Sequence, residues 1–331
     1  MKSCWKRTIL YASLILGYLF FLFLTTGTFS TQAHETSFVD NGSTHFFSCS
    51  DHDCAYLLNT LLNNSREARC AFYDIDTSII TLPAHAKTLI YDENFNTASG
   101  SGSEPVGSNG LMHHKFCIFD NRTVLTGTWN PTYRGTYVND NAIILLQSDV
   151  IAKLYNREYT RLEQRTGEQK GTNIHAKETY RINLSGRQIN LCFSPVQDCE
   201  RMLITQLENS QNTIRILAFM FTSDAVGEAL ERLSSNIKIQ GVFEATGVSR
   251  YSEFDTLVKA GADIIRDGNP GFMHEKMMII DNKTILIGSY NPTKNARKRN
   301  DENLLAITDQ TVARDALKEY DRIVLEARAN Q

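Results

Sequence analysis

The sequence predicts an α/β protein built from two homologous halves, each with helices covering a mixed sheet, behind an N-terminal hydrophobic segment. One motif is written twice, as residues 113–120 (HHKFCIFD) and residues 274–281 (HEKMMIID). A wider similarity surrounds both copies. In each half, apolar runs of strand length alternate with segments whose apolar residues have helical spacing. A repeat of this kind is typical of a duplicated α/β sandwich.

The N-terminal segment carries signals for export. Three basic residues precede an apolar run from Ile9 to Leu24, and a small polar stretch then leads to Ala33. This pattern is typical of either a cleaved signal peptide or a signal anchor with membrane association through residues 9–29, and both interpretations stay open. In either case we expect the rest of the chain to be exported, either secreted or periplasmic, or anchored on the outer face of the cell membrane.

Each motif is preceded by a predicted helix and a predicted strand. Residues 53–65 align with residues 198–210 without a gap, and both segments place apolar residues at helical spacing ahead of loop residues. Strands are expected at residues 69–73 and 214–221. The first half is shorter than the second between this strand and its motif, so the second half should hold the more complete fold.

Each motif itself predicts a β-hairpin. Side chains alternate along a strand, so His113 and Lys115 share one face, as do their equivalents in the second copy. An apolar run follows, then turn residues, then a return arm that ends in Gly-Thr-Trp-Asn (127–130) or Gly-Ser-Tyr-Asn (288–291). The return arm therefore brings a hydroxyl and an amide back beside the His and Lys. His114 points to the opposite face, where we expect a packed or surface residue.

These side chains suit a phosphate group. Lysine and asparagine donate hydrogen bonds to phosphoryl oxygens, and histidine can attack phosphorus or protonate a leaving oxygen. Displacement at a phosphodiester needs a nucleophile on one side and a general acid on the other. Two copies of the motif supply both roles. No metal or other cofactor is expected, because two lysines and two histidines already supply positive charge.

The pattern resembles the phospholipase D superfamily, whose signature is His-x-Lys, four residues, Asp, six residues, and Gly-Ser/Thr-x-Asn. Both copies match, with six residues between Asp120 and Gly127 and six between Asp281 and Gly288. The resemblance implies two α/β sandwich subdomains packed about a pseudo-twofold axis, with one active site between them. It also implies hydrolysis of a phosphodiester through a covalent phosphohistidine.

The resemblance implies a role for each motif residue. His113 is expected to attack phosphorus, and His274 to protonate the leaving alcohol and then activate water, although the sequence does not fix this assignment. The expected catalytic residues are His113, Lys115, Asp120, His274, Lys276 and Asp281. Asp120 and Asp281 lie at the far ends of their strands, which favours a structural role within this set. The residues expected to bind the substrate are Asn130, Asn291, Thr128 and Ser289.

Family members commonly carry an acidic residue after each motif, where it orients a catalytic His. Glu302 suits this supporting role, whereas its counterpart in the first half is Asn141. Only one His is therefore expected to have a carboxylate partner at this position. Asp140 and Asp301 are neighbouring alternatives, and the sequence does not show which of them points inward.

The repeat sets the expected domain boundaries. The polar stretch between the halves is a linker by composition alone. The expected order is an export segment at 1–33, a first subdomain at 34–165, a linker at 166–189 and a second subdomain at 190–331. Because one chain holds both motif copies, we expect it to act as a monomer.

Six cysteines lie beyond the export segment. Two local pairs are plausible disulfides, Cys49 with Cys54 and Cys192 with Cys199. Cys70 and Cys117 fall on predicted core strands that are possible neighbours. Free buried thiols stay open as the alternative, because pairing cannot be deduced from sequence. Disulfides would agree with an oxidising compartment outside the cytoplasm.

Charge gives weak guidance on the substrate. The chain has 34 basic and 37 acidic residues, and without residues 1–33 it has 31 basic and 37 acidic residues, a net charge of −6. General nucleic-acid binders usually rely on a cationic surface. One basic cluster follows the second motif, and it consists of Lys294, Arg297, Lys298 and Arg299. It suits a polyanion, an anionic lipid surface or plain solvent exposure.

We therefore predict a metal-independent phosphodiesterase, with a phospholipase D-type phospholipid hydrolase as the first interpretation. An exported endonuclease acting on DNA or RNA is the alternative. A phosphatidyltransferase or a non-catalytic binding module on the same fold are further alternatives. The non-catalytic binding module is disfavoured because both copies of the motif are complete.

Overall fold

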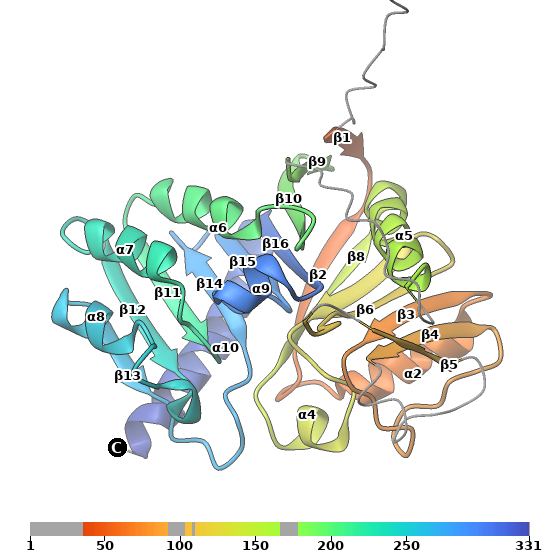
Figure 1. Cartoon of the computed structure of the whole chain (residues 1–331), viewed down its shortest axis with the longest axis horizontal. Coiled ribbons are helices and arrows are strands. Elements are labelled where there is room, and N and C mark those ends of the chain that lie inside the picture. Colours follow the sequence, from red (N-terminus) through yellow and green to blue (C-terminus); the bar gives the residue numbers. More distant parts are fainter. Residues whose placement is uncertain (1–35, 92–102, 108–109, 166–177, 331) are drawn as a thin grey trace, which may run out of the picture. The chain divides into compact units, whose positions relative to one another are not determined.

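The computed structural model describes residues 36–91, 103–107, 110–165 and 178–330 (Figure 1). The predicted export segment, residues 1–33, lies outside them. The described residues all belong to one compact unit that spans residues 36–331. Within this part of the chain, none of the helices combines the length and the apolar character needed to cross a bilayer.

The described residues of the first half form a seven-stranded mixed sheet with three helices. Its strands lie in the order β2-β8-β7-β6-β3-β4-β5. The strands are β2 (Ser43–Ser48), β3 (Ala68–Phe72), β4 (Ala86–Tyr91), β5 (Ser103–Val106), β6 (Lys115–Phe119), β7 (Thr123–Gly127) and β8 (Ala142–Gln147). The helices are α2 (Cys54–Asn64), α4 (Tyr133–Tyr137) and α5 (Asp149–Glu163).

The second half is a nine-stranded mixed sheet in the order β1-β9-β10-β16-β15-β14-β11-β12-β13. The strands are β1 (Ser37–Asp40), β9 (Tyr180–Leu184), β10 (Arg187–Ser194), β11 (Thr213–Ala218), β12 (Lys238–Phe243), β13 (Asp263–Arg266), β14 (Lys276–Ile280), β15 (Thr284–Gly288) and β16 (Glu302–Thr308). The helices are α6 (Cys199–Glu208), α7 (Asp224–Leu233), α8 (Phe254–Lys259), α9 (Lys294–Lys298) and α10 (Gln310–Ala329), with a short 3₁₀ helix at Ala245–Gly247.

The two sheets repeat one topology, as the sequence predicts. The order β2-β8-β7-β6-β3-β4-β5 recurs as β10-β16-β15-β14-β11-β12-β13. Both motifs form antiparallel hairpins, β6 with β7 and β14 with β15. The second half has α7 between β11 and β12, whereas the described residues between the equivalent strands β3 and β4 form no helix.

Local sequence signals fix where the paired helices begin. Asp53 caps α2 by accepting a hydrogen bond from the backbone N–H of Tyr56, and Asp198 caps α6 through that of Arg201. An acidic or hydroxyl side chain at this position satisfies an N–H group that has no partner inside the helix. The gapless alignment of these two segments therefore reflects one repeated helix start.

The predicted linker, residues 166–189, is wrong in its second part. Residues 180–184 form β9, and β10 begins at Arg187. Tyr180, Ile182 and Leu184 alternate with two exposed polar residues, which is the pattern of a half-buried strand. The polar composition of residues 166–189 led to the linker prediction, because the alternation in β9 is short. β1 also departs from the expected boundary, because it pairs with β9 in the second sheet rather than with the first.

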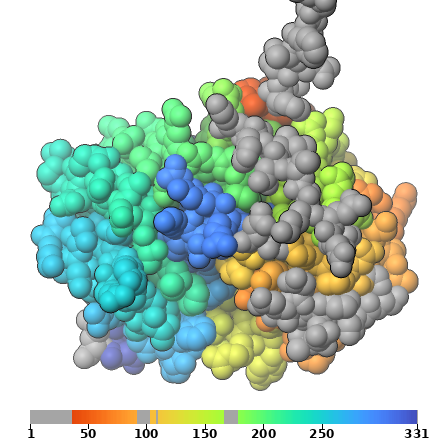
Figure 2. Space-filling model, viewed as in Figure 1, coloured from red at the N-terminus to blue at the C-terminus, as the bar shows by residue number. Residues whose placement is uncertain are grey.

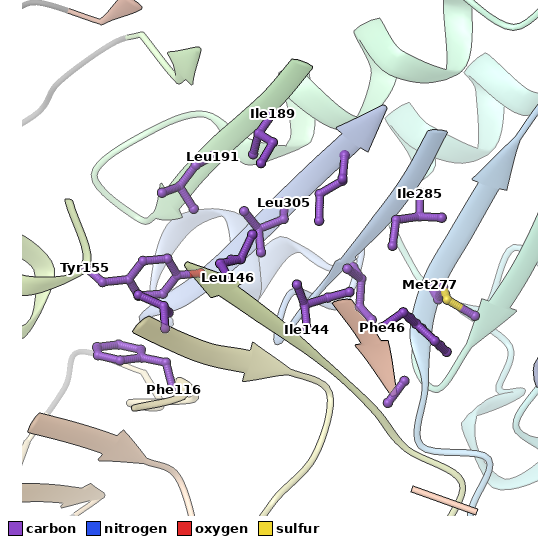
Figure 3. Packing of buried hydrophobic residues seen from close by; sticks show 14 of the residues in the cluster. Phe46, Phe116, Ile144, Leu146, Tyr155, Ile189, Leu191, Met277, Ile285 and Leu305 are labelled. Atoms are coloured by element: carbon purple, nitrogen blue, oxygen red, sulfur yellow. The ribbon is translucent and has the colours of Figure 1, made fainter. Parts of the chain in front are cut away.

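The largest hydrophobic core lies between the two sheets (Figure 3). Side chains of both halves meet there, and among them are Phe46, Phe116, Ile144, Leu146, Tyr155, Ile189, Leu191, Met277, Ile285 and Leu305. A separate core fills the outer side of each half. Burial of this apolar surface on both sides of each sheet explains the continuous apolar runs that follow the two motif lysines.

The six described cysteines form three disulfides. Cys49 pairs with Cys54, and Cys192 pairs with Cys199, each at the beginning of an equivalent helix. The third bond joins the neighbouring strands β3 and β6, where Cys70 faces Cys117. All three pairings that the sequence made plausible are present, and the free-thiol alternative is not.

Candidate active site

Each candidate His is held by the opposite half of the molecule. The backbone N–H of His113 donates to the carbonyl of Asp301 over 2.9 Å, and that of His274 donates to the carbonyl of Asp140 over 3.0 Å. Isolated bridges join Met112 to Asp301 and Met273 to Asp140 in the same two places. The site is therefore built across the halves, and neither hairpin completes it alone.

The ring of each His is also oriented from across the interface. Nδ1 of His113 lies 2.7 Å from a carboxylate oxygen of Glu302, and Nδ1 of His274 lies 2.9 Å from the amide oxygen of Asn141. An amide oxygen only accepts hydrogen bonds, so Nδ1 of His274 carries the proton that it donates to Asn141. An ionised carboxylate also only accepts, so Nδ1 of His113 carries a proton when Glu302 is ionised. This arrangement leaves Nε2 of each ring for chemistry.

Both candidate lysines are buried beside these histidines. Nζ of Lys115 donates to the carbonyl of His113 over 2.8 Å, and Nζ of Lys276 donates to the carbonyl of His274 over 2.6 Å. Burial lowers the pKa of Lys115 to about 7. Burial and the nearby Lys115 together hold the pKa of Lys276 well below its usual range. The cost of keeping two ammonium groups together out of water falls when an anion binds between them.

The two histidines share this electropositive environment. Burial, followed by the charges of Lys115 and Lys276, holds the pKa of His113 well below 6.5. Burial, Lys276 and Lys115 have the same effect on His274. The charge of the lysine from the other half thus lowers the pKa of each His, which means that the two motif copies converge on one site. A bound phosphate would offset the lysine charges and favour protonation of the His that acts as the acid.

Glu302 is a fully buried carboxyl. Burial raises its pKa to about 7, while the charge of Lys115 and hydrogen bonds from Ser289 and Asn300 act in the opposite direction. Asn300 Nδ2 lies 3.2 Å from its second oxygen. Glu302 is therefore held in place from several sides as the partner of His113.

The motif asparagines and hydroxyls have different surroundings. The side-chain oxygens of Asn130 and Asn291 are buried and have no hydrogen-bond partner among the described residues. By contrast, Thr128 donates to Asn141 over 3.0 Å, and Ser289 is hydrogen-bonded to Glu302. Both hydroxyls therefore contact the two residues that orient the histidines, and their expected contact with the substrate stays a prediction.

Asp120 and Asp281 lie away from the site, at the opposite ends of β6 and β14. Asp120 accepts hydrogen bonds from the backbone N–H groups of Arg66 and Glu67. Asp281 accepts three such bonds, from residues 211–213. Their place in the expected catalytic set is corrected, because side chains committed to backbone amides at a hairpin turn do not reach the histidines. The structural interpretation of these two residues agrees with this placement.

His114 is packed within the protein, as expected. Its side chain is fully buried, and Nε2 lies 2.8 Å from a carboxylate oxygen of Glu158 on α5. Trp129, which lies inside the first motif, is also buried and donates to Thr136. Neither side chain takes part in the candidate site.

Two aromatic residues at the site have no signal in the motif. The ring of Tyr73 lies 5.1 Å from that of His113, and the ring of Phe219 lies 4.6 Å from that of His274. Each ring also faces the neighbouring lysine, at 5.3 Å for Lys115 and 4.7 Å for Lys276. Tyr73 directly follows β3, and Phe219 directly follows β11, the strands that pair with the two motif hairpins. This position after a strand is the one sequence feature that indicates either residue.

Asp140 and Asp301 point away from the histidines and into ion pairs between the halves. Asp301 pairs with Arg161 and Arg165 at 2.6 and 2.8 Å, and Asp140 pairs with Arg322 at 2.5 Å. The arginines lie on or just after α5 and on α10. The question that the sequence left open is thus settled, since their neighbours Glu302 and Asn141 are the ones that face the site.

Within the described ranges, no group of three or more His, Cys, Asp or Glu side chains is arranged to hold a metal ion. The candidate site brings together two imidazoles, each held at Nδ1, and two ammonium groups. These groups suit attack on phosphorus and protonation of a leaving oxygen.

Two His-Lys pairs that converge across a duplicated α/β fold define a phosphodiester-processing enzyme. The chain belongs to the phospholipase D superfamily. Residues 100–163 and 203–324 match the family described as cardiolipin synthase, PLD-like domain, and the sequence carries both copies of the signature.

Relatives with known names agree with this membership. A phospholipase D of Rickettsia typhi is 31% identical over 139 residues, which cover 41% of this chain and 68% of that protein. The human mitochondrial cardiolipin hydrolase is 30% identical over 123 residues, which cover 37% of this chain and 49% of that protein. In fold, the chain resembles the phosphatidylserine synthase of Haemophilus influenzae Rd KW20, with a TM-score of 0.65 at 13% identity over 85% of this chain and 86% of that one.

Proposed function

We propose that this protein hydrolyses the phosphodiester bond of a phospholipid through a covalent phosphohistidine, without a metal ion. The observation that carries the proposal is the pair of oriented histidines, each held at Nδ1 by a side chain of the opposite half. One His serves as nucleophile and the other as general acid, and the lysines and motif asparagines hold the phosphoryl oxygens.

The different partners of the two histidines favour His113 as the nucleophile. When Nε2 of His113 bonds to phosphorus, its ring becomes cationic, and the carboxylate of Glu302 at 2.7 Å offsets that charge. Asn141 has no charge with which to stabilise a protonated His274. Since a less stabilised imidazolium gives up its proton more readily, His274 suits the general acid.

The reaction then takes two steps. In the first, Nε2 of His113 attacks phosphorus, the bond to the leaving alcohol breaks, and His274 donates a proton to the alcohol oxygen. In the second, neutral His274 takes a proton from water, the water oxygen bonds to phosphorus, and the bond to His113 breaks. Both residues return to their first state, and the net reaction is the addition of water across one P–O bond.

Three observations support a phospholipid over a nucleic acid. Relatives are named for phospholipid and cardiolipin hydrolysis. The chain beyond residue 33 has a net charge of −6. Large apolar side chains are exposed beside the loop that leads to His274, and they are Tyr133, Tyr137, Val138 and Phe272. Aromatic side chains of this kind suit the interface between water and lipid.

The basic cluster on α9 lies on the same visible face as α4, in blue and yellow respectively in Figure 2. Lys294 and Lys298 are the pseudo-symmetric equivalents of Tyr133 and Tyr137, since each pair is separated by the 161 residues that separate the two motifs. The helix α4 thus carries aromatic side chains where its counterpart α9 carries cationic ones. Cations attract the headgroups of anionic lipids, and aromatic rings enter the interface.

We further propose that the protein acts outside the cytoplasm as a monomer. The N-terminal pattern of basic and apolar residues supports export, and three disulfides support an oxidising compartment. Both halves of the site come from one chain, so no second copy is needed to complete it. Detection of the disulfide-bonded protein outside the cytoplasm, together with its mass in solution, would test both statements.

The test of the proposed reaction is product release by the purified protein from residue 34 onward, in EDTA. Anionic and zwitterionic liposomes, single-stranded DNA and double-stranded DNA serve as substrates, and His113→Ala and His274→Ala serve as controls. Headgroup release that both substitutions abolish supports the proposal. DNA cleavage without headgroup release would replace it with a nuclease, and silence on every substrate would leave a binding module.

Glu302→Gln is expected to lower turnover by about 100-fold and to leave KM nearly unchanged. The amide keeps the shape of the side chain and its contact with Nδ1, but it does not offset the positive charge of the phosphohistidine. Steady-state headgroup release measures the effect. Asn141→Ala should act on the other His, so in the first turnover it should slow release of an alcohol but not of nitrophenol, which leaves without protonation. Equal losses with both leaving groups would contradict these roles.

Tyr133→Ser is expected to raise the apparent KM for liposomes by about five-fold or more and to leave turnover of a soluble bis(p-nitrophenyl) phosphodiester unchanged. Tyr133 is 57% exposed, so its loss should not disturb the core. Tyr251, which is 64% exposed on the second half, provides the matched control Tyr251→Ser. If both variants bind liposomes like the wild type, the exposed aromatic side chain of Tyr133 has no part in membrane contact.

A further inference from the structure

Two ion-pair clusters between the halves are related by the repeat. The first consists of His114, Glu158, Arg161, Arg165 and Asp301. Equivalent positions of the two halves differ by 161 in residue number, as His113 and His274 do. The second cluster occupies the positions equivalent to the first and consists of Glu275, Glu319, Arg322, Glu326 and Asp140. Arg322 pairs there with Asp140, Glu319 and Glu326. Each cluster joins the last helix of one half to the loop ahead of the last strand of the other.

The clusters differ in charge at two positions. His114 and Arg165 of the first cluster are replaced by Glu275 and Glu326 in the second. The first cluster therefore sets two arginines and a histidine against two carboxyls. The second sets one arginine against four carboxyls. The side-chain amide of Asn269 donates to Asp140 over 2.6 Å, whereas the equivalent Asp301 accepts from the second arginine, Arg165.

Glu275 is the unusual member of the second cluster. Its side chain is fully buried, and neither carboxyl oxygen has a hydrogen-bond partner among the described residues. Burial, followed by the charges of Glu319 and Asp140, holds the pKa of Glu275 well above its usual range. The charged groups that act on it come from β14, from α10 and from the loop ahead of β8, and they are Lys276, Glu319, Arg322 and Asp140.

Further acids surround this cluster. Burial, with the charges of Asp140 and Glu244, raises the pKa of Asp267 to about 6. Asp140 itself has a pKa above its usual range because of burial, which Arg322 opposes. Glu244 is committed to the backbone N–H of Met273. A charge on Glu275 would therefore meet carboxyl groups on several sides and only one nearby arginine.

The second cluster is connected directly to His274. The carbonyl of Asp140 accepts the backbone N–H of His274, and the next residue, Asn141, holds its ring. Glu275 is the next residue along the chain from His274, and its carbonyl accepts the N–H of Phe219, whose ring contacts that of His274. Movement of Asp140 or of Glu275 would therefore shift the ring of His274.

We propose that Glu275 is a positioning residue for His274 and that the cluster around it is a proton-dependent latch. With its proton, Glu275 sits as a neutral group beside Glu319 and Asp140, and Arg322 holds the two halves together. Without its proton, it repels both carboxylates and loosens the contact of Asp140 and Asn141 with His274. The first cluster has no counterpart of this unpartnered carboxyl, since His114 occupies the position of Glu275. This inference about activity rests on the proposed function, whereas its effect on stability does not.

The direction of the pH effect follows from proton binding. Because Glu275 has a higher pKa in the folded state than its ordinary value of 4.5, the folded protein binds more protons than the unfolded protein between these two values. Its contribution to stability is therefore complete below about pH 4.5 and is lost as the pH rises to the folded pKa. For one proton, the unfolding equilibrium constant rises by up to about ten-fold per pH unit in this window.

The test compares the wild type with Glu275→Gln and Glu275→Met by denaturant unfolding between pH 5 and pH 9. Neither substitution removes a hydrogen bond, and neither can ionise. Relative to each variant, the wild type should lose stability by about ten-fold in its unfolding constant per pH unit over part of this range. Glu231→Gln, on the exposed face of α7, is the control for loss of a carboxyl group and should follow the wild type.

Turnover of bis(p-nitrophenyl) phosphate provides the second measurement. The wild type should lose turnover at alkaline pH over the range in which it loses stability, and Glu275→Gln should extend activity to higher pH. Parallel stability curves for the wild type and both variants would overturn the latch, whatever the activity. A wild type that has the expected stability slope but no turnover on any phosphodiester would keep the latch and overturn the proposed function instead. If stability shifts but the pH profiles of turnover coincide, Glu275 does not position His274.

Discussion

His113→Ala is expected to reduce turnover by about a thousand-fold or more, on any phosphodiester and with any leaving group. Without Nε2 of His113, no covalent intermediate forms, and the remaining groups only bind and polarise the substrate. Retention of more than about a tenth of wild-type turnover would contradict the assignment of His113 as nucleophile.

Comparison with His274→Ala separates the two histidines. Bis(p-nitrophenyl) phosphate has a leaving group that departs without protonation, so His274→Ala should release about one equivalent of nitrophenol per protein in a burst and then stall, because no base activates water. His113→Ala should show no burst. Acid quench after the burst should leave phosphorus bound to the protein. A burst from His113→Ala, with none from His274→Ala, would exchange the two roles.

Lys115→Met is expected to lower turnover by about 100- to 1,000-fold and, at the same time, to raise the stability of the folded protein. Lys115 donates to the carbonyl of His113 and lies close enough to Lys276 to lower its pKa, and in the proposed mechanism its ammonium stabilises negative charge on the phosphoryl oxygens. In the free protein that ammonium is buried at a cost, which methionine of similar length avoids. We expect a melting temperature about 3 °C or more above that of the wild type near neutral pH.

The pH dependence of this gain has a defined sign. Burial lowers the pKa of Lys115 from its ordinary value of 10.5 to about 7, so the folded protein binds fewer protons than the unfolded protein between these values. Wild-type stability should therefore rise with pH across this window, and the advantage of Lys115→Met should shrink from pH 7 toward pH 10.5. Thermal unfolding at several pH values measures it. Lys153→Met, at an exposed position of α5, is the control, and a variant that is less stable at every pH would contradict the argument.

Local patterns predicted much of the fold. The alternation of His and Lys with apolar residues, followed by Asp-Asn turns, predicts the hairpins β6–β7 and β14–β15, and both are present. Asp and Asn occupy both turns with positive φ, which these two residues tolerate better than most. Such features depend on neighbours within a few residues, so the sequence contains the whole cause. β9 shows the limit of this reasoning, because its composition resembles a linker and one of its two pairing partners, β1, is distant in sequence.

Composition and motif spacing by themselves determined the repeat and the family, and they predicted which His, Lys and Asn residues are candidates for the chemistry. Only the tertiary structure decided how the two copies combine: Glu302 orients the His of the other half, and Asn141 does the same in return. Thr128 and Ser289 in turn contact these two partners. The reason is physical, since an orienting hydrogen bond depends on the position of two atoms to within a few tenths of an ångström. Packing of the two sheets against one another sets that position, and residues far apart in the chain determine the packing.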